Sequence, residues 1–185
     1  FIPNAINIGL DGKFAPWAGA LIPDLKQEIL IVCEPGNEEE VITRLSRVGY
    51  DFTIGYLDGG FESWMKGKHE VDAIESVSAE EVYKLTGNDP SLPIMDVRKK
   101  SEYDAEHLLN AVNAPLDFVN DSMTKIDRNK KTLVHCAGGY RSVIFISILK
   151  ARGYNNLVNI AGGFKALKDT GKFKVSDYVA PTTML

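Results

Sequence analysis

A chain of 185 residues, 44% of them hydrophobic, is long enough to bury one large core or two small ones, and its composition does not suggest disorder. Its 21 basic and 25 acidic residues give a net charge of -4, without the basic excess typical of proteins that bind nucleic acid or anionic membranes. No stretch approaches the roughly 20 apolar residues of a membrane span, and the first residues do not resemble a signal peptide. We therefore expect a cytoplasmic protein whose partners are small molecules or proteins, with no nucleic acid and no membrane.

Residues 1–67 contain an apolar run, Ile29-Leu30-Ile31-Val32, which predicts a buried strand ending next to Cys33. The loop that follows has no arginine and is acidic, with glutamates at positions 34, 38, 39 and 40. Negative charge at this point disfavours a thiolate, so we interpret Cys33 as a packing residue. The glutamates also suit the N-terminus of a following helix, which gives them a sufficient structural role.

The next segment, residues 68–77, is polar with little helical periodicity and is the predicted linker. After it, Ser78-Ala79-Glu80-Glu81 has the pattern of an N-capped first helical turn. Pro93 to Val97 then predicts a buried strand, and Lys99 to Glu106 a short polar helix.

A further series of elements completes the chain before a C-terminal tail at residues 171–185. The predicted elements are a strand at Leu133–His135, a helix from Ser142 to Arg152, a strand from Asn156 to Ile160 and a helix from Gly162 to Lys168. This alternation predicts an α/β fold with a parallel sheet and crossover helices.

An internal repeat organises these elements into two modules. Three short segments recur in the same order at offsets of 106, 104 and 103 residues, namely Asn4-Ala5-Ile6-Asn7 as Asn110-Ala111-Val112-Asn113, Gly49-Tyr50 as Gly153-Tyr154, and Gly59-Gly60-Phe61 as Gly162-Gly163-Phe164. We therefore expect two related modules at residues 1–67 and 78–170, each a parallel sheet flanked by helices. The first lacks a counterpart of the first helix and strand of the second, so it is predicted to be incomplete at its N-terminus.

The segment His135-Cys136-Ala137-Gly138-Gly139-Tyr140-Arg141-Ser142 places a cysteine between the end of a strand and the start of a helix. The two glycines allow successive backbone N–H groups to point inward, and the helix dipole and Arg141 add positive charge. Such surroundings lower the pKa of a thiol from about 8.5 and favour the nucleophilic thiolate. The alternative is a buried thiol in a tight turn, but the combined pattern favours a reactive Cys136.

Cys136, four intervening residues and Arg141 resemble the active loop of the rhodanese family of sulfurtransferases. The other landmarks of that family are similar and occur in order: Asp96-Val97-Arg98, Glu102-Tyr103, Asn110 to Pro115 and Gly162-Gly163-Phe164. One departure is Glu106-His107-Leu108-Leu109, where the family usually has Gly-His-Ile-Pro, and we expect it to alter only a loop.

The resemblance implies that Cys136 accepts a sulfane sulfur from a donor such as thiosulfate or a persulfide and becomes a persulfide. It then passes the sulfur to cyanide, a thiol or a protein cysteine in a ping-pong cycle. No cofactor is implied beyond this covalent intermediate. No metal is expected, because His69, His107 and His135 are far apart and share no recognisable spacing with the cysteines.

Within the loop, the backbone of Ala137, Gly138, Gly139 and Tyr140 is expected to hold the persulfide, with Tyr140 at the mouth. Arg141 is expected to bind the sulfonate of an anionic donor.

Ser142 either caps the following helix or hydrogen-bonds to the outer sulfur, and we favour the cap. His135 is expected in the core, because successive strand residues point to opposite faces. Asp96 and Arg98 are expected to form an ion pair that orients the loop.

Tandem modules with one silent copy are familiar in the rhodanese family, and the silent copy there serves as a scaffold or docking surface. The first module fits that description. The arrangement also resembles the C-terminal half of fusion proteins that begin with a metallo-β-lactamase-type domain, so the resemblance implies such an upstream partner in a longer protein that starts before Phe1.

Two rival functions remain open. A cysteine phosphatase of related fold places five residues between cysteine and arginine, whereas this chain has four, which favours sulfur transfer. A non-catalytic interaction module would use the fold only as a surface, and the presence of both Cys136 and Arg141 argues against it for the second module.

Overall fold

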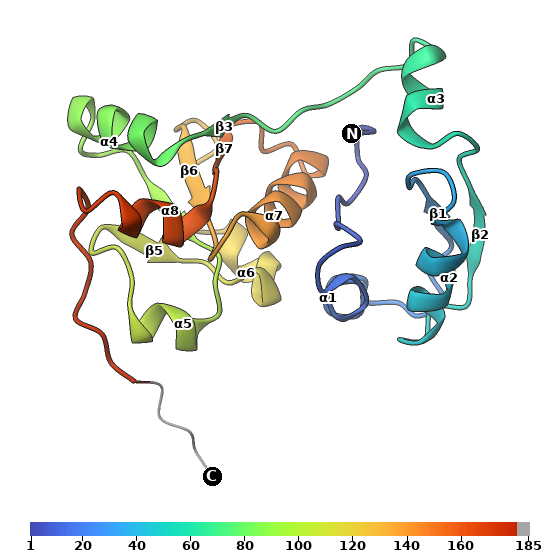
Figure 1. The fold of residues 1–185 in the computed structure, drawn as a ribbon. Helices are drawn as coiled ribbons and strands as arrows, with labels where there is room; N and C mark the ends of the chain where they lie inside the picture. The colour runs from blue at the N-terminus through green and yellow to red at the C-terminus, as the bar shows by residue number, and fades with distance from the viewer. Residues whose placement is uncertain (181–185) are drawn as a thin grey trace. The chain divides into compact units, whose positions relative to one another are not determined.

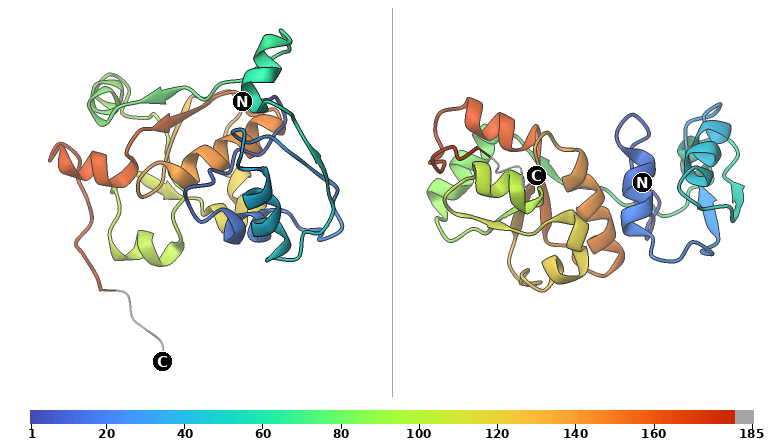
Figure 2. Two further views of the ribbon diagram at one scale, coloured as in Figure 1. Left: turned by 45° about the vertical axis from the view of Figure 1, so that its right-hand side comes forward. Right: turned by 90° about the horizontal axis from the view of Figure 1, so that it is seen from below.

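The computed structural model describes residues 1–180, and the chain separates into two units, Phe1–Ala73 and a second one that starts at Ile74 (Figures 1 and 2). The division lies within residues 68–77, the segment predicted as a linker. Of the predicted tail, residues 181–185 lie outside the described residues. Among residues 1–180, no helix is long and apolar enough to cross a membrane.

The second unit is built on a five-stranded sheet whose strands are all parallel, which confirms the predicted α/β class. The strands are β3 (Ser76–Val77), β4 (Ile94–Asp96), β5 (Ala111–Asn113), β6 (Thr132–His135) and β7 (Leu157–Ile160). Their order is β3-β7-β6-β4-β5, so β6 lies in the middle and pairs with both β4 and β7. Every residue of β4, β6 and β7 is buried, as expected for parallel strands covered on both faces.

Helices cover both faces of this sheet (Figure 1). They are α4 (Ala79–Asn88), α5 (Lys100–Ala105), α6 (Val119–Met123), α7 (Tyr140–Ala151) and α8 (Gly163–Asp169), with a 3₁₀ turn η1 at Leu116–Phe118. The predicted N-cap of α4 is confirmed, because the Ser78 hydroxyl accepts from the Glu81 N–H and the Glu81 carboxylate accepts from the Ser78 N–H. The helix predicted from Ser142 begins two residues earlier, at Tyr140.

The core of the second unit joins α4 and α8 to one face of the sheet. Val82 of α4 and Leu167 of α8 are fully buried against Leu133 of β6 and Ile160 of β7. On the other face, α7 packs against β6 and β7 and buries most of its length. The buried residues of α7 include the whole run from Ile144 to Leu149, so the helix is covered around most of its circumference, in keeping with its apolar composition.

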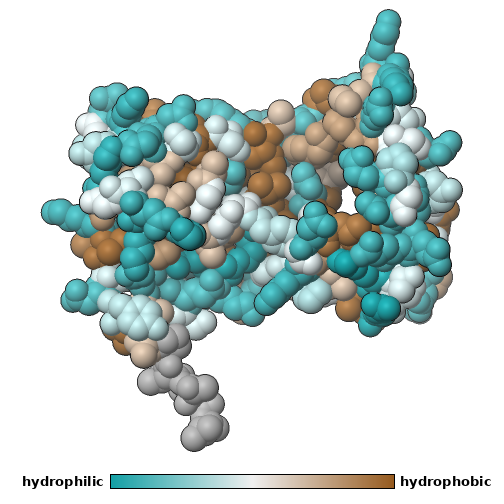
Figure 3. Space-filling view, in the orientation of Figure 1, coloured by the Kyte–Doolittle hydropathy of each residue, from teal (hydrophilic) through white to brown (hydrophobic). Residues whose placement is uncertain are grey.

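The first unit is much smaller, as the repeat predicts. It consists of α1 (Phe14–Leu21), β1 (Ile29–Ile31), α2 (Glu38–Ser46), β2 (Thr53–Tyr56) and α3 (Gly60–Lys66). Its two strands are parallel and its core gathers Ala18, Ile31, Val41, Leu45 and Tyr50. Hydrophobic residues also reach the molecular surface among hydrophilic ones (Figure 3).

Asn4-Ala5-Ile6-Asn7 forms no strand, although its repeat in the second unit supplies β5. In the second unit, β5 pairs with β4 alone, and the described part of the first unit has no counterpart of β4. The strand therefore depends on a partner that this unit lacks.

Candidate active site

The loop from Cys136 to Arg141 connects the central strand β6 to the buried helix α7. The strand ends at His135, and Gly139 is the N-cap residue of α7 with a φ of 107°, a left-handed conformation that glycine adopts without strain. The sequence prediction of a strand, a glycine turn and a helix start at this point is therefore confirmed.

The Cys136 thiol lies at the base of this turn. Cys136 is only 1% exposed, and its Sγ accepts a hydrogen bond from the backbone N–H of Gly139 at 3.1 Å. Ala137 and Gly138 at the tip of the loop are exposed, and a Cβ at Gly138 would meet no atom within 4 Å. The sulfur is thus held by the backbone next to the positive end of α7, beneath a tip that is open to solvent.

Ser142 does not cap the helix, and that prediction was wrong. Gly139 is the N-cap residue, and Ser142 lies in the first turn of α7, fully buried. Its hydroxyl contacts the Asn159 side-chain oxygen at 2.7 Å and lies 3.7 Å from the Sγ of Cys136. The alternative, a hydrogen bond to the outer sulfur of a persulfide, stays a prediction, and the structure shows a contact of the hydroxyl with Sγ itself.

Arg141 is held by a carboxylate from another helix. Its Nη1 and Nη2 donate to the two oxygens of Glu102 on α5, at 2.5 and 2.8 Å. The hydrogen bond to Glu102 is the main cause that raises the pKa of Arg141, and the charge of Cys136 and a hydrogen bond with it raise it further. The guanidinium therefore interacts with both the Glu102 carboxylate and the Cys136 sulfur.

Glu102 is the site residue that sequence reasoning missed. The Glu102-Tyr103 pair was noted only as a landmark, and 39 residues separate Glu102 from Arg141. Its bond to Arg141 is also the main cause that lowers the pKa of Glu102, so the carboxylate is ionised at neutral pH.

Asp96 and Arg98 form the predicted ion pair beneath the loop. The Nε of Arg98 donates to both oxygens of Asp96 at 2.9 Å, and its Nη2 donates to Oδ2 at 2.5 Å. Both side chains are buried, and the guanidinium also lies 4.1 Å from the ring centroid of Phe164. The Val97 N–H donates to the His135 carbonyl, which ties this segment to the strand that carries Cys136.

His135 is fully buried, as predicted for a core residue. Its Nδ1 lies 3.2 Å from the Cys136 carbonyl oxygen, so this nitrogen carries the proton, because a carbonyl can only accept. Burial is the main cause that lowers the pKa of His135, and its Nε2 is 3.9 Å from Asp96 Oδ2. The ring is therefore neutral near pH 7.

The repeated Gly-Gly-Phe segment has a clear structural reason. The Phe164 N–H donates to the Cys136 carbonyl at 2.7 Å, and the Lys165 N–H donates to the Ala137 carbonyl at 3.2 Å. A Cβ at Gly163 would collide with the Cys136 carbonyl oxygen, so only glycine permits this close approach of α8 to the loop. The start of α8 thereby fixes the backbone that carries Cys136.

The site in the first unit differs in charge. Burial is the main cause that raises the pKa of Cys33, and Glu38 and Glu34 raise it further. The structure therefore agrees with the prediction of a disfavoured thiolate, with burial as the larger contribution. Both cysteines are free thiols.

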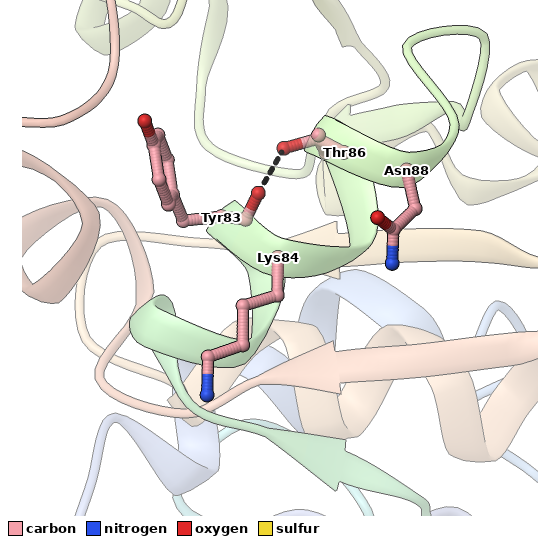
Figure 4. Close-up of a pocket in the computed structure, with 5 residues that line it drawn as sticks. Tyr83, Lys84, Thr86 and Asn88 are labelled. Carbon is pink, nitrogen blue, oxygen red and sulfur yellow. Dashed lines mark hydrogen bonds between the residues drawn. The ribbon is translucent and has the colours of Figure 1, made fainter.

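A separate hollow lies on the surface of α4, lined by Tyr83, Lys84, Thr86, Gly87 and Asn88 (Figure 4). Within it the Thr86 hydroxyl donates to the Tyr83 carbonyl at 3.3 Å. None of its lining residues belongs to the Cys136 loop, so the two sites are distinct. Among residues 1–180 there is also no group of three or more His, Cys, Asp or Glu side chains that could hold a metal ion.

Comparison with known proteins places this geometry in a family. A family model described as a rhodanese-like domain matches residues 1–67 and 78–170. The chain is 28% identical to the putative sulfur carrier protein YrkF of Bacillus subtilis over 102 residues, which cover 54% of this chain and 55% of that protein. It is 31% identical to the thiosulfate sulfurtransferase GlpE of Coxiella burnetii over 75 residues, which cover 40% of this chain and 70% of that protein.

The chain spans only part of its curated relatives. It covers 55% of YrkF and 23% of the tRNA uridine(34) hydroxylase of Erwinia tasmaniensis, to which it is 32% identical over 82 residues, or 41% of this chain. Among solved structures, a rhodanese-like domain protein from Staphylococcus aureus is 28% identical with a TM-score of 0.50, and the match covers 56% of this chain and all of that one. The rhodanese-like domain of an Anabaena protein has a TM-score of 0.52 at 22% identity, covering 61% of this chain and 86% of that one, and supports the fold alone.

Proposed function

Because the chain belongs to the rhodanese-like domain family, we propose that it is a sulfurtransferase that carries a sulfane sulfur on Cys136. The observation that carries this proposal is the position of Sγ, which accepts the Gly139 N–H at the start of α7 while Arg141 lies beside it. A sulfur so placed suits an anion, either the thiolate or the persulfide that forms from it.

In the loading step, the Cys136 thiolate attacks the outer, sulfane sulfur of a donor. The sulfur–sulfur bond of the donor breaks, and the electron pair leaves with sulfite when the donor is thiosulfate, or with a thiolate when it is a persulfide. The new persulfide lies within reach of the backbone N–H groups of the loop, which Ala137, Gly138, Gly139 and Tyr140 supply.

In the transfer step, a nucleophilic acceptor attacks the outer sulfur of the Cys136 persulfide and regenerates the thiolate. Cyanide, a small thiol or a protein cysteine satisfies this requirement, since each forms a bond to sulfur without an external oxidant. The Ser142 hydroxyl lines the sulfur site 3.7 Å from Sγ, while its proton is donated to the Asn159 side-chain oxygen at 2.7 Å. Neither step calls for a metal or an organic cofactor.

Asp96 and Arg98 have a supporting role in this proposal. Their buried ion pair flanks Val97, whose backbone N–H donates to the carbonyl of His135, the residue before Cys136. Arg98 also donates to the Glu106 carbonyl at 2.8 Å, at the C-terminus of α5, the helix that carries Glu102.

The finer organisation of the protein is also a proposal. We take residues 1–67 to be a silent copy that serves as a scaffold, and residues 78–170 to be the active copy. The proposed location of the protein is the cytoplasm. The extension to a preceding metallo-β-lactamase-type domain rests on family resemblance alone.

The test is the mass of the intact protein after incubation with thiosulfate or with a persulfide. A gain of one sulfur, about 32 Da, that reductant reverses and that Cys136→Ser prevents, is the expected result. No gain with either donor would exclude the sulfur carrier and leave the non-catalytic interaction module as the function.

A further inference from the structure

We propose that the sulfur donor is an organic persulfide, R–S–SH, in preference to thiosulfate, and that Glu102 sets this preference by occupying Arg141. The inference rests on the proposed function and narrows its substrate class. It is carried by the pairing of Arg141 with Glu102, because Arg141 is the cation on which thiosulfate recognition in this loop was expected to depend.

The ion pair between Glu102 and Arg141 has the geometry of a strong interaction. Glu102 and Arg141 meet through two parallel N–H···O bonds, and the side chains are only 37% and 15% exposed. Glu102 is further held as part of a capping arrangement, because its Oε2 accepts the Lys99 N–H at the start of α5 at 3.2 Å. Bidentate pairs of this kind are the stronger class of ion pair.

The neighbouring cations are also paired. Lys100 contacts Asp104 at 2.7 Å, Lys99 lies 3.8 Å from Asp117, and Arg98 is held by Asp96. The lowered pKa of His135 keeps that ring neutral. When Cys136 reacts as a thiolate, its charge and that of the Glu102 carboxylate lie beside the single Arg141 guanidinium, and these three groups carry a net of one negative charge.

A thiosulfate dianion approaching these groups would face two anions and a cation that both of them already share. A persulfide carries at most one negative charge on its reacting sulfurs, so it meets less repulsion. The helix start and the loop N–H groups favour either donor, so they do not offset this difference.

The persulfide reaction needs no sulfonate site. The Cys136 thiolate attacks the terminal sulfur of R–S–SH, a Cys136–S–SH bond forms, the donor S–S bond breaks, and R–S⁻ leaves with the electron pair. No net oxidation or reduction and no further reactant is involved. The carrier R has room at the loop tip, since Ala137 and Gly138 are exposed and a Cβ at Gly138 would meet open space.

The experiment compares kcat/KM for thiosulfate and for cysteine persulfide in the full chain and in Glu102→Gln. We expect the unmodified protein to prefer the persulfide by about tenfold or more, and Glu102→Gln to shift the ratio toward thiosulfate by about tenfold, because one repelling charge is removed. Asp104→Asn, on the same helix but in an exposed pair with Lys100, is the matched control and should leave the ratio unchanged.

A second measurement needs no variant. Rising salt concentration should increase kcat/KM for thiosulfate, because salt screens repulsion, whereas an attractive sulfonate site would show a decrease. Equal use of both donors, a ratio that Glu102→Gln does not change, or a falling salt dependence would each overturn the role of Glu102. Failure of the proposed function looks different, since neither donor would then load Cys136 with sulfur.

Discussion

The strands of the two units differ in how far their hydrophobic side chains are exposed, because the second unit has a covering helix that the first one lacks. Counted back from Cys33 and Cys136, Leu30 of the first unit corresponds to Leu133 of the second, and the two are 72% and 0% exposed. The neighbouring strand β2 likewise exposes Ile54 and Tyr56, at 56% and 52%, whereas every residue of β7 is buried. The difference follows from α4, which packs on this face in the second unit and has no counterpart in residues 1–73.

The loops that begin at Cys33 and Cys136 share a backbone arrangement but differ in the charges near the sulfur. Each follows a parallel strand with a cysteine, and each packs its cysteine carbonyl against a glycine, Gly60 in one and Gly163 in the other. The backbone frame is thus shared, but burial, followed by Glu38 and Glu34, raises the pKa of Cys33, whereas Cys136 has the Arg141 guanidinium beside it. Backbone geometry alone therefore does not make the site.

The largest expected effect separates the two cysteines. Cys136→Ser should lower sulfur transfer by about a thousandfold or more, because a serine hydroxyl neither attacks sulfane sulfur readily nor stores it as a persulfide. Cys33→Ser should keep nearly full activity. A steady-state assay of both variants decides the matter, and the reverse pattern would move the active site to the first unit.

A second large effect concerns the buried ion pair. Arg98→Ala should reduce the free energy of unfolding of the second unit by about 3–5 kcal/mol, since it leaves the Asp96 carboxylate buried without its partner. Denaturation followed by circular dichroism measures it. The matched control is Lys100→Ala in an exposed pair, for which a loss above about 1 kcal/mol would contradict the argument.

Truncation of corresponding leucines sharpens the comparison of the strands. Leu133→Ala should cost about 2–5 kcal/mol, because it opens a cavity in a filled core. Leu30→Ala should cost about 0.5 kcal/mol or less, since that side chain is mostly in solvent. Both tryptophans, Trp17 and Trp64, lie in the first unit, so fluorescence follows its unfolding separately. Equal costs would mean that the exposed face of β1 and β2 is covered in solution.

The smallest expected effect is a pH dependence confined to the second unit. His135 stands where the first unit has Val32, and burial lowers its pKa, so the folded state favours the neutral ring. Its contribution is fully present above the unfolded value, about 6.5, and is lost as pH falls below it, because the unfolded chain then binds the proton more readily. The slope of stability between about pH 6.5 and 5 should diminish in His135→Gln, and an identical slope would assign the effect to other groups.

Local pattern determined much of this protein. Apolar runs of strand length, the glycine turn before α7 and the Ser78 capping box predict their elements to within about two residues, because hydrogen bonds and φ preferences act between near neighbours. The Cys136 loop with its arginine was likewise predictable as a spacing within one short segment. The repeat also indicated that the first module lacks part of the fold.

Only the tertiary structure decided how the loop is surrounded. The Ser142 hydroxyl faces Asn159 and Cys136 because α7 begins at Tyr140, and the capping position falls on Gly139 instead. The pairing of Arg141 with Glu102 joins residues on two helices that the sheet brings together, and no local preference encodes such a contact. The charge around Arg141 depends on groups that are near in space but distant in sequence. The burial of Ser142 depends on the elements that pack against α7. Both features of the site are therefore set only when the chain is folded.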